Sequence, residues 1–102
     1  MATIILVPER RNKARASVFK ALGHPARLIM VDALRTGEKC VCDLRDLVNL
    51  DMSTVSKHLS VLKAAGIVSG RKQGNWVWYS LELSCLDNFL GCLDGFLDSL
   101  NN

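Results

Sequence analysis

The hydrophobic period of this 102-residue chain changes twice along its length, and this change limits the folds that it can adopt. Apolar residues recur every three to four positions through residues 14–65, which predicts helices. Residues 67–81 are instead rich in strand formers around a polar tip at 72–75, which predicts a β-hairpin. Helical spacing returns over residues 83–100. We therefore expect a group of helices, one hairpin and a last helix.

Turn and capping residues divide the first part into four helices. The first is predicted over residues 14–22, and Pro25 is expected in the first turn of the second. Asp43 is expected to cap a short third helix, and Ser53 a longer fourth helix that Gly66 ends. A short helix, a turn and a longer helix predict a helix-turn-helix.

The last predicted helix is apolar over an unusually wide arc. Its two apolar stripes are Leu86, Leu90, Leu93, Leu97 and Leu100, and beside them Cys85, Phe89, Cys92 and Phe96. So wide an arc needs two surfaces to bury against, and a small domain provides one of them. The second surface is expected to be another copy of the chain, which predicts a homodimer.

Composition restricts the class of protein. With 49% hydrophobic and 23% charged residues, the chain is an ordinary globular protein, and neither a disordered nor a fibrous class fits. The apolar run at residues 4–7 is too short for a signal-peptide core or a membrane span, so we expect a cytoplasmic protein without membrane contact. Thiols stay reduced in that compartment, so the four cysteines are interpreted as ligands, redox groups or core residues.

The charge is unevenly distributed. Residues 1–81 contain all 13 Lys and Arg against six acids, a net charge of +7, whereas residues 82–102 contain four acids and no base. A basic body favours contact with DNA, and the acidic tail favours a different task.

Cys40 and Cys42 place two thiols one residue apart, directly before the predicted third helix. Two soft ligands so close together suit a thiophilic ion. Residues two apart point roughly 200° apart on a helix but to the same side of an extended segment, so both thiols can hold one ion only where the segment is extended or unwound. Binding is then expected to pull on the third helix, whose packing sets the fourth, and to weaken DNA binding.

Three short motifs and the order of the elements resemble the ArsR/SmtB family of winged-helix, metal-responsive repressors over roughly residues 14–100. The motifs are Ala21-Leu-Gly-His-Pro-Ala-Arg-Leu28, Cys40-Val-Cys-Asp-Leu44 and Ser53-Thr-Val-Ser-Lys-His-Leu59. The resemblance implies a mainly α (α+β) winged helix-turn-helix of order α-α-α-α-β-β-α, whose N- and C-terminal helices form a dimer interface. It also implies a regulator, not an enzyme: a homodimer that holds double-stranded operator DNA upstream of resistance genes and releases it when an inducer binds.

The expected organisation is one domain over residues 1–102. The helix-turn-helix spans about residues 43–65, the β-wing about 67–81 and the C-terminal dimerisation helix about 84–100.

A fourth helix in the major groove would present its exposed residues to bases and phosphates, and the wing would lie against phosphates or the minor groove. The residues expected to contact DNA are Ser53, Thr54, Ser56, Lys57, His58, Ser60, Lys63, Arg71, Lys72 and Gln73. For His58, helix packing is an equally open interpretation. The sequence does not assign a target to the basic cluster Arg10, Arg11, Lys13 and Arg15. Trp76 and Trp78 share one strand face, which favours packing over base stacking.

The resemblance favours arsenite or antimonite as the inducer, held by three thiolates. Family members often carry a third Cys three residues after the second, where this chain has Arg45, so the third metal ligand would be Cys92 or Cys85, with Cys92 slightly favoured. These two are about 10.5 Å apart along a helix and cannot share an ion within one chain, but either could come from its own subunit or the partner. Cadmium, lead and mercury remain possible inducers, and no organic cofactor is expected. The absence of His after position 58 disfavours the zinc site that some family members have on the last helix.

Two alternatives remain open. One is a thiol-redox repressor of the same fold, in which Cys85 or Cys92 crosslinks the dimer on oxidation. The other is a small arsenic-binding protein or reductase that does not bind DNA. The lack of a Cys-x-x-Cys pair and of an acid-base partner near Cys40 disfavours this second alternative.

Overall fold

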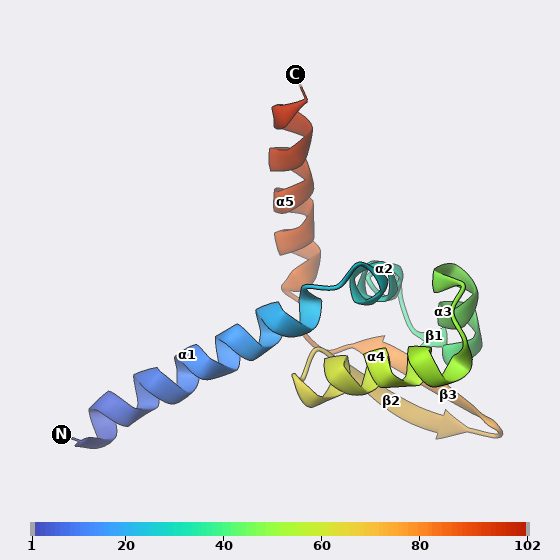
Figure 1. The fold of residues 1–102 in the computed structure, drawn as a ribbon, viewed down its shortest axis with the longest axis horizontal. Helices are drawn as coiled ribbons and strands as arrows, with labels where there is room; N and C mark the ends of the chain where they lie inside the picture. The colour runs from blue at the N-terminus through green and yellow to red at the C-terminus, as the bar shows by residue number, and fades with distance from the viewer. Residues whose placement is uncertain (1, 102) are drawn as a thin grey trace.

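The computed structural model describes the backbone of residues 2–101 and the side chains of residues 8–101. Within this range the elements are α1 (Ala2–Leu22), α2 (Pro25–Leu34), β1 (Lys39–Cys40), α3 (Val41–Val48), α4 (Met52–Ala64), β2 (Val68–Gln73), β3 (Trp76–Leu81) and α5 (Leu86–Leu100). Helices α2, α3 and α4 pack against the small sheet, whereas α1 and α5 project from this body in different directions (Figure 1). The predicted order of four helices, a hairpin and a last helix is present, with β1 as an addition.

The sheet is antiparallel, with β3 between β1 and β2. Trp78 on β3 pairs with Cys40 on β1 and with Arg71 on β2, so these three residues form one row across the sheet. The sequence does not predict β1, because two residues are too few to show an alternating pattern. This strand forms only because β3 supplies its hydrogen-bond partners.

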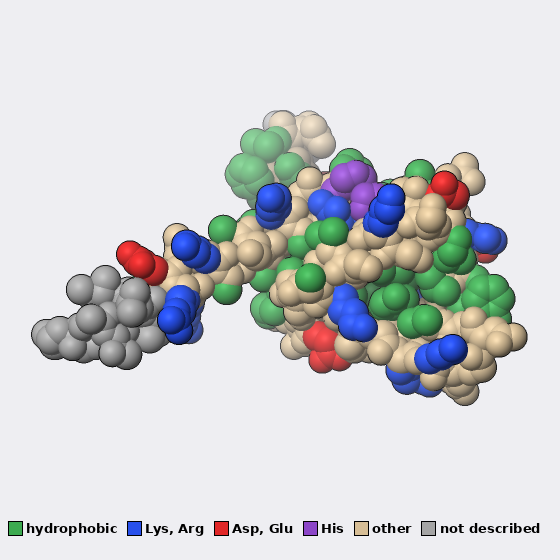
Figure 2. All heavy atoms as spheres, turned by 60° about the horizontal axis from the view of Figure 1, so that its bottom comes forward, with side chains coloured by type: hydrophobic (Ala, Val, Ile, Leu, Met, Phe, Trp, Pro, Cys, Tyr) green, Lys and Arg blue, Asp and Glu red, His purple; other side chains and the backbone are tan. Residues whose placement is uncertain are grey.

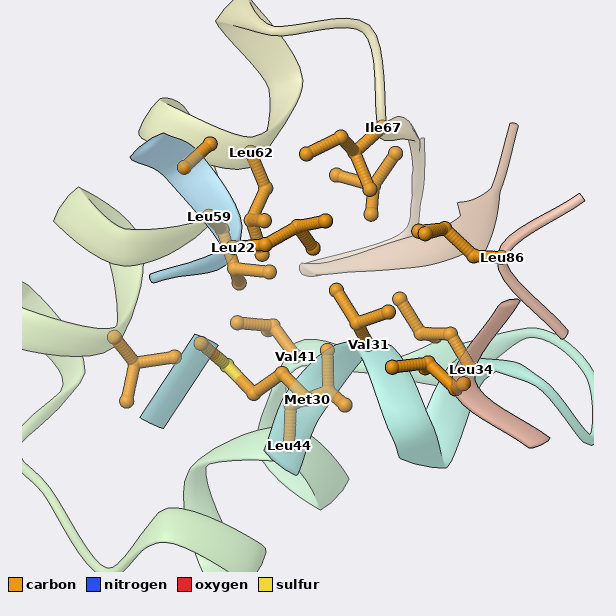
Figure 3. Close-up of a cluster of buried hydrophobic side chains, with 14 of the residues drawn as sticks. Leu22, Met30, Val31, Leu34, Val41, Leu44, Leu59, Leu62, Ile67 and Leu86 are labelled. Atoms are coloured by element: carbon orange, nitrogen blue, oxygen red, sulfur yellow. The ribbon is translucent and has the colours of Figure 1, made fainter. Parts of the chain in front are cut away.

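The core lies where the helices meet the sheet, and its side chains point toward one another from both halves of the chain (Figure 3). Its fully buried members are Met30, Val31, Leu44, Val55, Leu59, Leu62 and Ile67. Ala21 and Leu22 from the end of α1, and Leu86 and Leu90 from the first half of α5, complete it.

Two predicted caps are wrong. Helix α3 is capped by Cys40, whose Sγ accepts a hydrogen bond from the backbone N–H of Cys42, and Asp43 lies in the first turn. Helix α4 is capped by Asp51, whose Oδ1 accepts from the N–H of Thr54 at 2.8 Å, and not by Ser53. In both cases the residue with extended backbone, which lets its side chain turn back to the first N–H groups, precedes the predicted cap.

Helix α1 begins at Ala2, twelve residues before the predicted start at residue 14. Pro8 lies inside this helix, although it cannot donate a backbone hydrogen bond there. Apart from Asn12, the residues from Glu9 to Ala16 that follow it are good helix formers, which favours the helix beyond the missing donor. The side chains of residues 1–7, to which the sequence assigns no role, lie outside the described residues.

Helix α5 begins at Leu86, three residues later than the predicted helical pattern. Only Leu86 and Leu90 of this helix are buried, and every residue from Gly91 to Leu100 is exposed. None of the helices within residues 2–101 combines the length and apolar content that a bilayer crossing requires.

Candidate DNA-binding surface and thiol site

A tight turn sets the angle between α3 and α4. Asn49 ends α3 in the left-handed conformation, with φ 54°, and its N–H donates to the carbonyl of Arg45 at 2.9 Å. Asparagine tolerates this conformation better than most residues. Asp51 then starts α4, whose Val55, Leu59 and Leu62 are completely buried. Because the inner face of α4 is fixed by these three residues, its opposite face is turned to solvent.

The outer face of α4 is polar. Of the residues predicted to contact DNA, Ser53, Ser56, Lys57, Ser60 and Lys63 are exposed, and Thr54 is half-buried beside them. Figure 2 shows Lys and Arg side chains over α4 and over the hairpin on one face of the molecule. The helix and the hairpin can therefore contact one extended anion together.

His58 is placed differently from the other predicted DNA contacts. The centroid of its ring lies 4.4 Å from that of the His24 ring, and its Nδ1 is 3.3 Å from Nη1 of Arg27. Arg27 also donates to the carbonyl of Ala21 at 2.6 Å, so this cluster connects α1, α2 and α4. Burial, followed by the nearby His24 and Arg27, lowers the pKa of His58. The imidazole is thus held neutral in a helix junction, in line with the packing interpretation.

The wing residues are exposed, but Arg71 already has partners. Its guanidinium donates to both carboxylate oxygens of Glu38, at 2.7 and 3.0 Å, and to the side chain of Gln73 at 2.6 Å. The hydrogen bonds from Arg71 hold the pKa of Glu38 below its ordinary value. Lys72 is exposed on the same strand, next to the turn at Gly74, which has φ 65°. DNA phosphates would therefore compete with Glu38 for Arg71.

The two tryptophans of β3 differ in burial. Trp76 is 50% exposed near the hairpin turn, whereas Trp78 is half-buried and packs against the core. The prediction of packing therefore holds for Trp78 and not for Trp76.

The Cys40 and Cys42 thiols lie together at the start of α3. Cys40 is 3% exposed and has an extended backbone, and Cys42 is half-buried in the first turn. The hydrogen bond with the Cys40 side chain, and then burial, raise the pKa of the Cys42 thiol. Cys40 thus lies on extended backbone, whereas Cys42 is already part of α3.

Cys85, directly before α5, and Cys92, within α5, are both exposed. Cys85 borders a small apolar hollow of about 240 Å³ together with Phe19 and Phe89. Among the described residues, no three His, Cys, Asp or Glu side chains are grouped closely enough to hold a metal ion. One chain therefore provides two adjacent thiols and not a three-thiol site.

Three residues of this region were missed by sequence reasoning. Asp51 had a local signature, since an acidic residue before an apolar-periodic helix is a common cap. Glu38 and Arg27 had none, because their partners Arg71 and His58 are 33 and 31 residues away.

Comparison with known proteins supports the class that the sequence predicts, a DNA-binding regulator. Residues 24–69 match the family model described as "Bacterial regulatory protein, arsR family". The chain is 44% identical over 72 residues to the HTH-type transcriptional regulator MJ1325 of Methanocaldococcus jannaschii, which covers 70% of this chain and 80% of that protein. It is 35% identical over 78 residues to the arsenical resistance operon repressor of Staphylococcus aureus, covering 76% of this chain and 75% of the relative. A cadmium resistance regulatory protein, the CadC homolog of Staphylococcus aureus, is 43% identical over 66% of this chain and 56% of its own length.

Solved structures agree with this assignment. The homodimeric winged helix-turn-helix DNA-binding domain Mb0332 of Mycobacterium bovis superposes with a TM-score of 0.79 at 25% identity, over 89% of this chain and 84% of the other. Rv0081 of Mycobacterium tuberculosis superposes with a TM-score of 0.77 at 32% identity, over 87% of this chain and 90% of the other.

Fold, polar recognition helix and basic hairpin together define a winged helix-turn-helix DNA-binding protein, as the sequence predicts. The chain belongs to the ArsR/SmtB family of transcriptional repressors, which are regulators and not enzymes.

Proposed function

We propose that this chain is a homodimeric operator-binding repressor that a thiophilic inducer releases from DNA by binding at Cys40 and Cys42. The observation that carries the proposal is the position of these thiols. The Sγ of Cys40 accepts a hydrogen bond from the backbone N–H of Cys42 at the start of α3, one element away from the recognition helix. Cys40 is also part of the sheet of the wing. An ion bound there acts on both DNA-contacting elements at once.

Operator contact is assigned to the polar face of α4 and to the wing. Residues at the start of α4 would read base edges in the major groove, with Lys63 and the wing bases on phosphates. The proposed contacts are Ser53, Thr54, Ser56, Lys57, Ser60, Lys63, Arg71, Lys72 and Gln73. His58 is assigned a supporting role, because its ring is engaged by His24 and Arg27.

Dimerisation is assigned to α5 together with α1. One apolar face of α5 is exposed, and it consists of Phe89, Leu93, Phe96, Leu97 and Leu100. The ring of Phe19 on α1 packs edge-on against that of Phe89, with the ring centroids 6.2 Å apart. Contiguous apolar surface of this kind is typical of protein–protein contact. The homodimeric state of the Mb0332 domain supports this assignment. A dimer would also present two recognition helices to the two half-sites of an operator.

The inducer site is assigned first to the Cys40–Cys42 pair. Arsenite and antimonite favour three thiolates, and the third would be Cys92 or Cys85 of the partner subunit, since one chain does not group three ligands among its described residues. The arsenical resistance repressor and the cadmium resistance regulator among the relatives support a thiophilic inducer. Lead and mercury ions also prefer thiolate ligands, and two thiolates are enough to coordinate mercury.

Release follows from what the two thiols hold in place. The Cys40 sulfur caps α3. Val41, between the two cysteines, and Leu44, two residues after Cys42, lie in the core with Val55 of α4. Cys40 also pairs with Trp78, which pairs with Arg71. Drawing the thiols around an ion shifts α3 against α4 and β1 against the wing, so the bound form fits the operator less well. A preference of a few kcal/mol for this form lowers operator affinity at least about a hundredfold.

The proposal is tested by titrating reduced protein bound to its own promoter DNA with arsenite, antimonite or Cd²⁺. Wild type should be released, and Cys40→Ser and Cys42→Ser should bind DNA equally well but stay bound. Cys85→Ser and Cys92→Ser identify the third ligand, since only the variant lacking it should lose the arsenite response. Equal operator affinity with and without each ion would contradict the proposal, and release by peroxide in the Cys40→Ser/Cys42→Ser variant would favour the redox alternative.

Proton release distinguishes the classes of inducer. The raised pKa of Cys42 keeps this thiol protonated near neutral pH. A divalent ion must displace that proton, so its binding should strengthen as pH rises. Arsenous acid instead exchanges its hydroxyl groups for thiolates, and each thiol proton leaves with a hydroxyl as water, so no net proton is released. A pH series of inducer affinity between about pH 6 and 8, a window below the ordinary thiol pKa, therefore separates the two.

A further inference from the structure

The exposed bases of α1 have no part in the site described above. Between Pro8 and Leu22 the helix carries Arg10, Arg11, Lys13, Arg15 and Lys20 against one acid, Glu9, and all six are exposed. Four ion pairs occur among the side chains of residues 8–101, and none of them involves these five bases. Their charge is therefore available to an external anion.

Three of these bases share one side of the helix. Arg10, Lys13, Ser17 and Lys20 follow at intervals of three, four and three residues, which places them in one row. Arg11 and Arg15 lie roughly 160° away around the helix, at 100° per residue. The helix thus has a basic row and, on the opposite side, a second basic pair.

The basic row starts beside the recognition helix. Ser17 and Lys20 line a groove of about 470 Å³, whose other wall includes Val61 and Ala64 of α4. Arg27 lines the same groove from α2. In Figure 2, Lys and Arg side chains continue along α1 on the face that also carries those of α4 and the hairpin. Because α4 and the row border one groove, DNA that touches the exposed face of α4 passes close to the row.

We propose that Arg10, Lys13 and Lys20 bind backbone phosphates of the duplex that α4 contacts, so that α1 extends the DNA footprint beyond the helix-turn-helix and wing. This inference rests on the proposed function, because it requires α4 to face DNA. The row extends over about 15 Å of helix, which equals the rise of about four base pairs. Lys and Arg on phosphates position a protein without reading sequence, so the added contacts strengthen binding to every duplex.

The test compares two charge-matched variants of the full-length protein. Arg10→Ala/Lys13→Ala removes two bases from the row, and Arg11→Ala/Arg15→Ala removes two bases from the opposite side of the same helix. Alanine is the best helix former, so α1 is retained in both. Fluorescence anisotropy measures affinity for promoter DNA and for a mixed-sequence duplex of about 40 base pairs, roughly four turns, between about 50 and 200 mM salt. Sedimentation of both variants should give the oligomeric state of wild type.

The row variant should bind both duplexes more weakly. The slope of log affinity against log salt should fall by about 0.9 for each phosphate that the variant no longer neutralises, doubled where two protomers contribute. The opposite-side variant should keep the slope of wild type. Equal changes in the two variants, or no change in the row variant, would overturn the inference. Lys57→Ala serves as the control for the proposed function. If Lys57→Ala weakens operator binding and the row variant does not, the recognition helix still contacts DNA and only the proposed role of α1 is rejected.

Discussion

Helices α4 and α5 have similar lengths, 13 and 15 residues, but they bury their apolar side chains in different ways. Val55, Leu59 and Leu62 of α4 are completely enclosed by their own chain, and the opposite face is polar. On α5 only Leu86 and Leu90 are buried, while Phe96 is 56% and Leu100 is 65% exposed. Helix α4 therefore completes the fold and offers polar groups to a ligand, whereas the apolar face of α5 favours contact with another protein surface.

The largest expected effect comes from emptying the inner face of α4. Leu59→Ala should lower the free energy of unfolding by about 2–5 kcal/mol, because it leaves a cavity in the core. Urea denaturation of wild type and variant measures this loss in the free energy of unfolding. Val61→Ala, on the exposed side of the same helix, should change the free energy of unfolding by no more than about 0.5 kcal/mol. Similar losses in both variants would show that the two faces of α4 do not differ in their contribution to stability.

A charge on the outer face of α5 should act on assembly and not on folding. Leu97→Asp should weaken dimerisation at least about a hundredfold, since burying an unpaired carboxylate in an interface costs several kcal/mol. Analytical ultracentrifugation gives the dimer affinity, and circular dichroism should report an unchanged helix content. Asn88→Asp adds the same charge to an exposed polar position of α5 and serves as the control. A Leu97→Asp protein that dimerises like wild type would exclude this face as the interface.

The polar face of α4 should separate base reading from phosphate contact. Lys57→Ala should cost about 1–3 kcal/mol on the operator and relax its sequence preference, whereas Lys63→Ala should weaken binding about equally on all sequences. Anisotropy titrations on promoter and scrambled duplexes give both quantities. If Lys63→Ala alone relaxed the preference, the two assignments would have to be exchanged.

The smallest expected effect concerns the cap that starts α4. Hydrogen bonds from Thr54 lower the pKa of Asp51, so the ionised carboxylate stabilises the fold. This contribution is fully present above the pKa of an unfolded aspartate and is lost as pH falls through the lowered folded pKa. Thermal unfolding of Asp51→Asn, which keeps an acceptor without titrating there, should therefore lose this acid-side dependence. If the melting temperature of the variant changes with acid pH as that of wild type does, Asp51 does not contribute to this pH dependence.

Local patterns were sufficient for most of the fold. The period of apolar residues predicted the helices, and Gly66, with φ 80°, marks the end of α4 as expected. The wrong caps at Asp43 and Ser53 reflect a limit of such patterns. They offer more than one polar residue as a cap, and the extended backbone at Cys40 and Asp51 decides which one acts. Strand β1 and the Glu38–Arg71 pair depend on contacts between distant segments.

The turn residues, the apolar period and the polar start of α4 are enough to identify a winged helix-turn-helix repressor with two thiols at the start of α3. Which groups meet in space depends on the tertiary structure. It placed Cys40 in one row with Trp78 and Arg71, turned His58 toward His24, and put Lys20 of α1 in one groove with Val61 and Ala64 of α4. The reason is physical: helix and strand formation depend on neighbours along the chain, whereas pairing across a sheet or a helix junction depends on how the whole core packs.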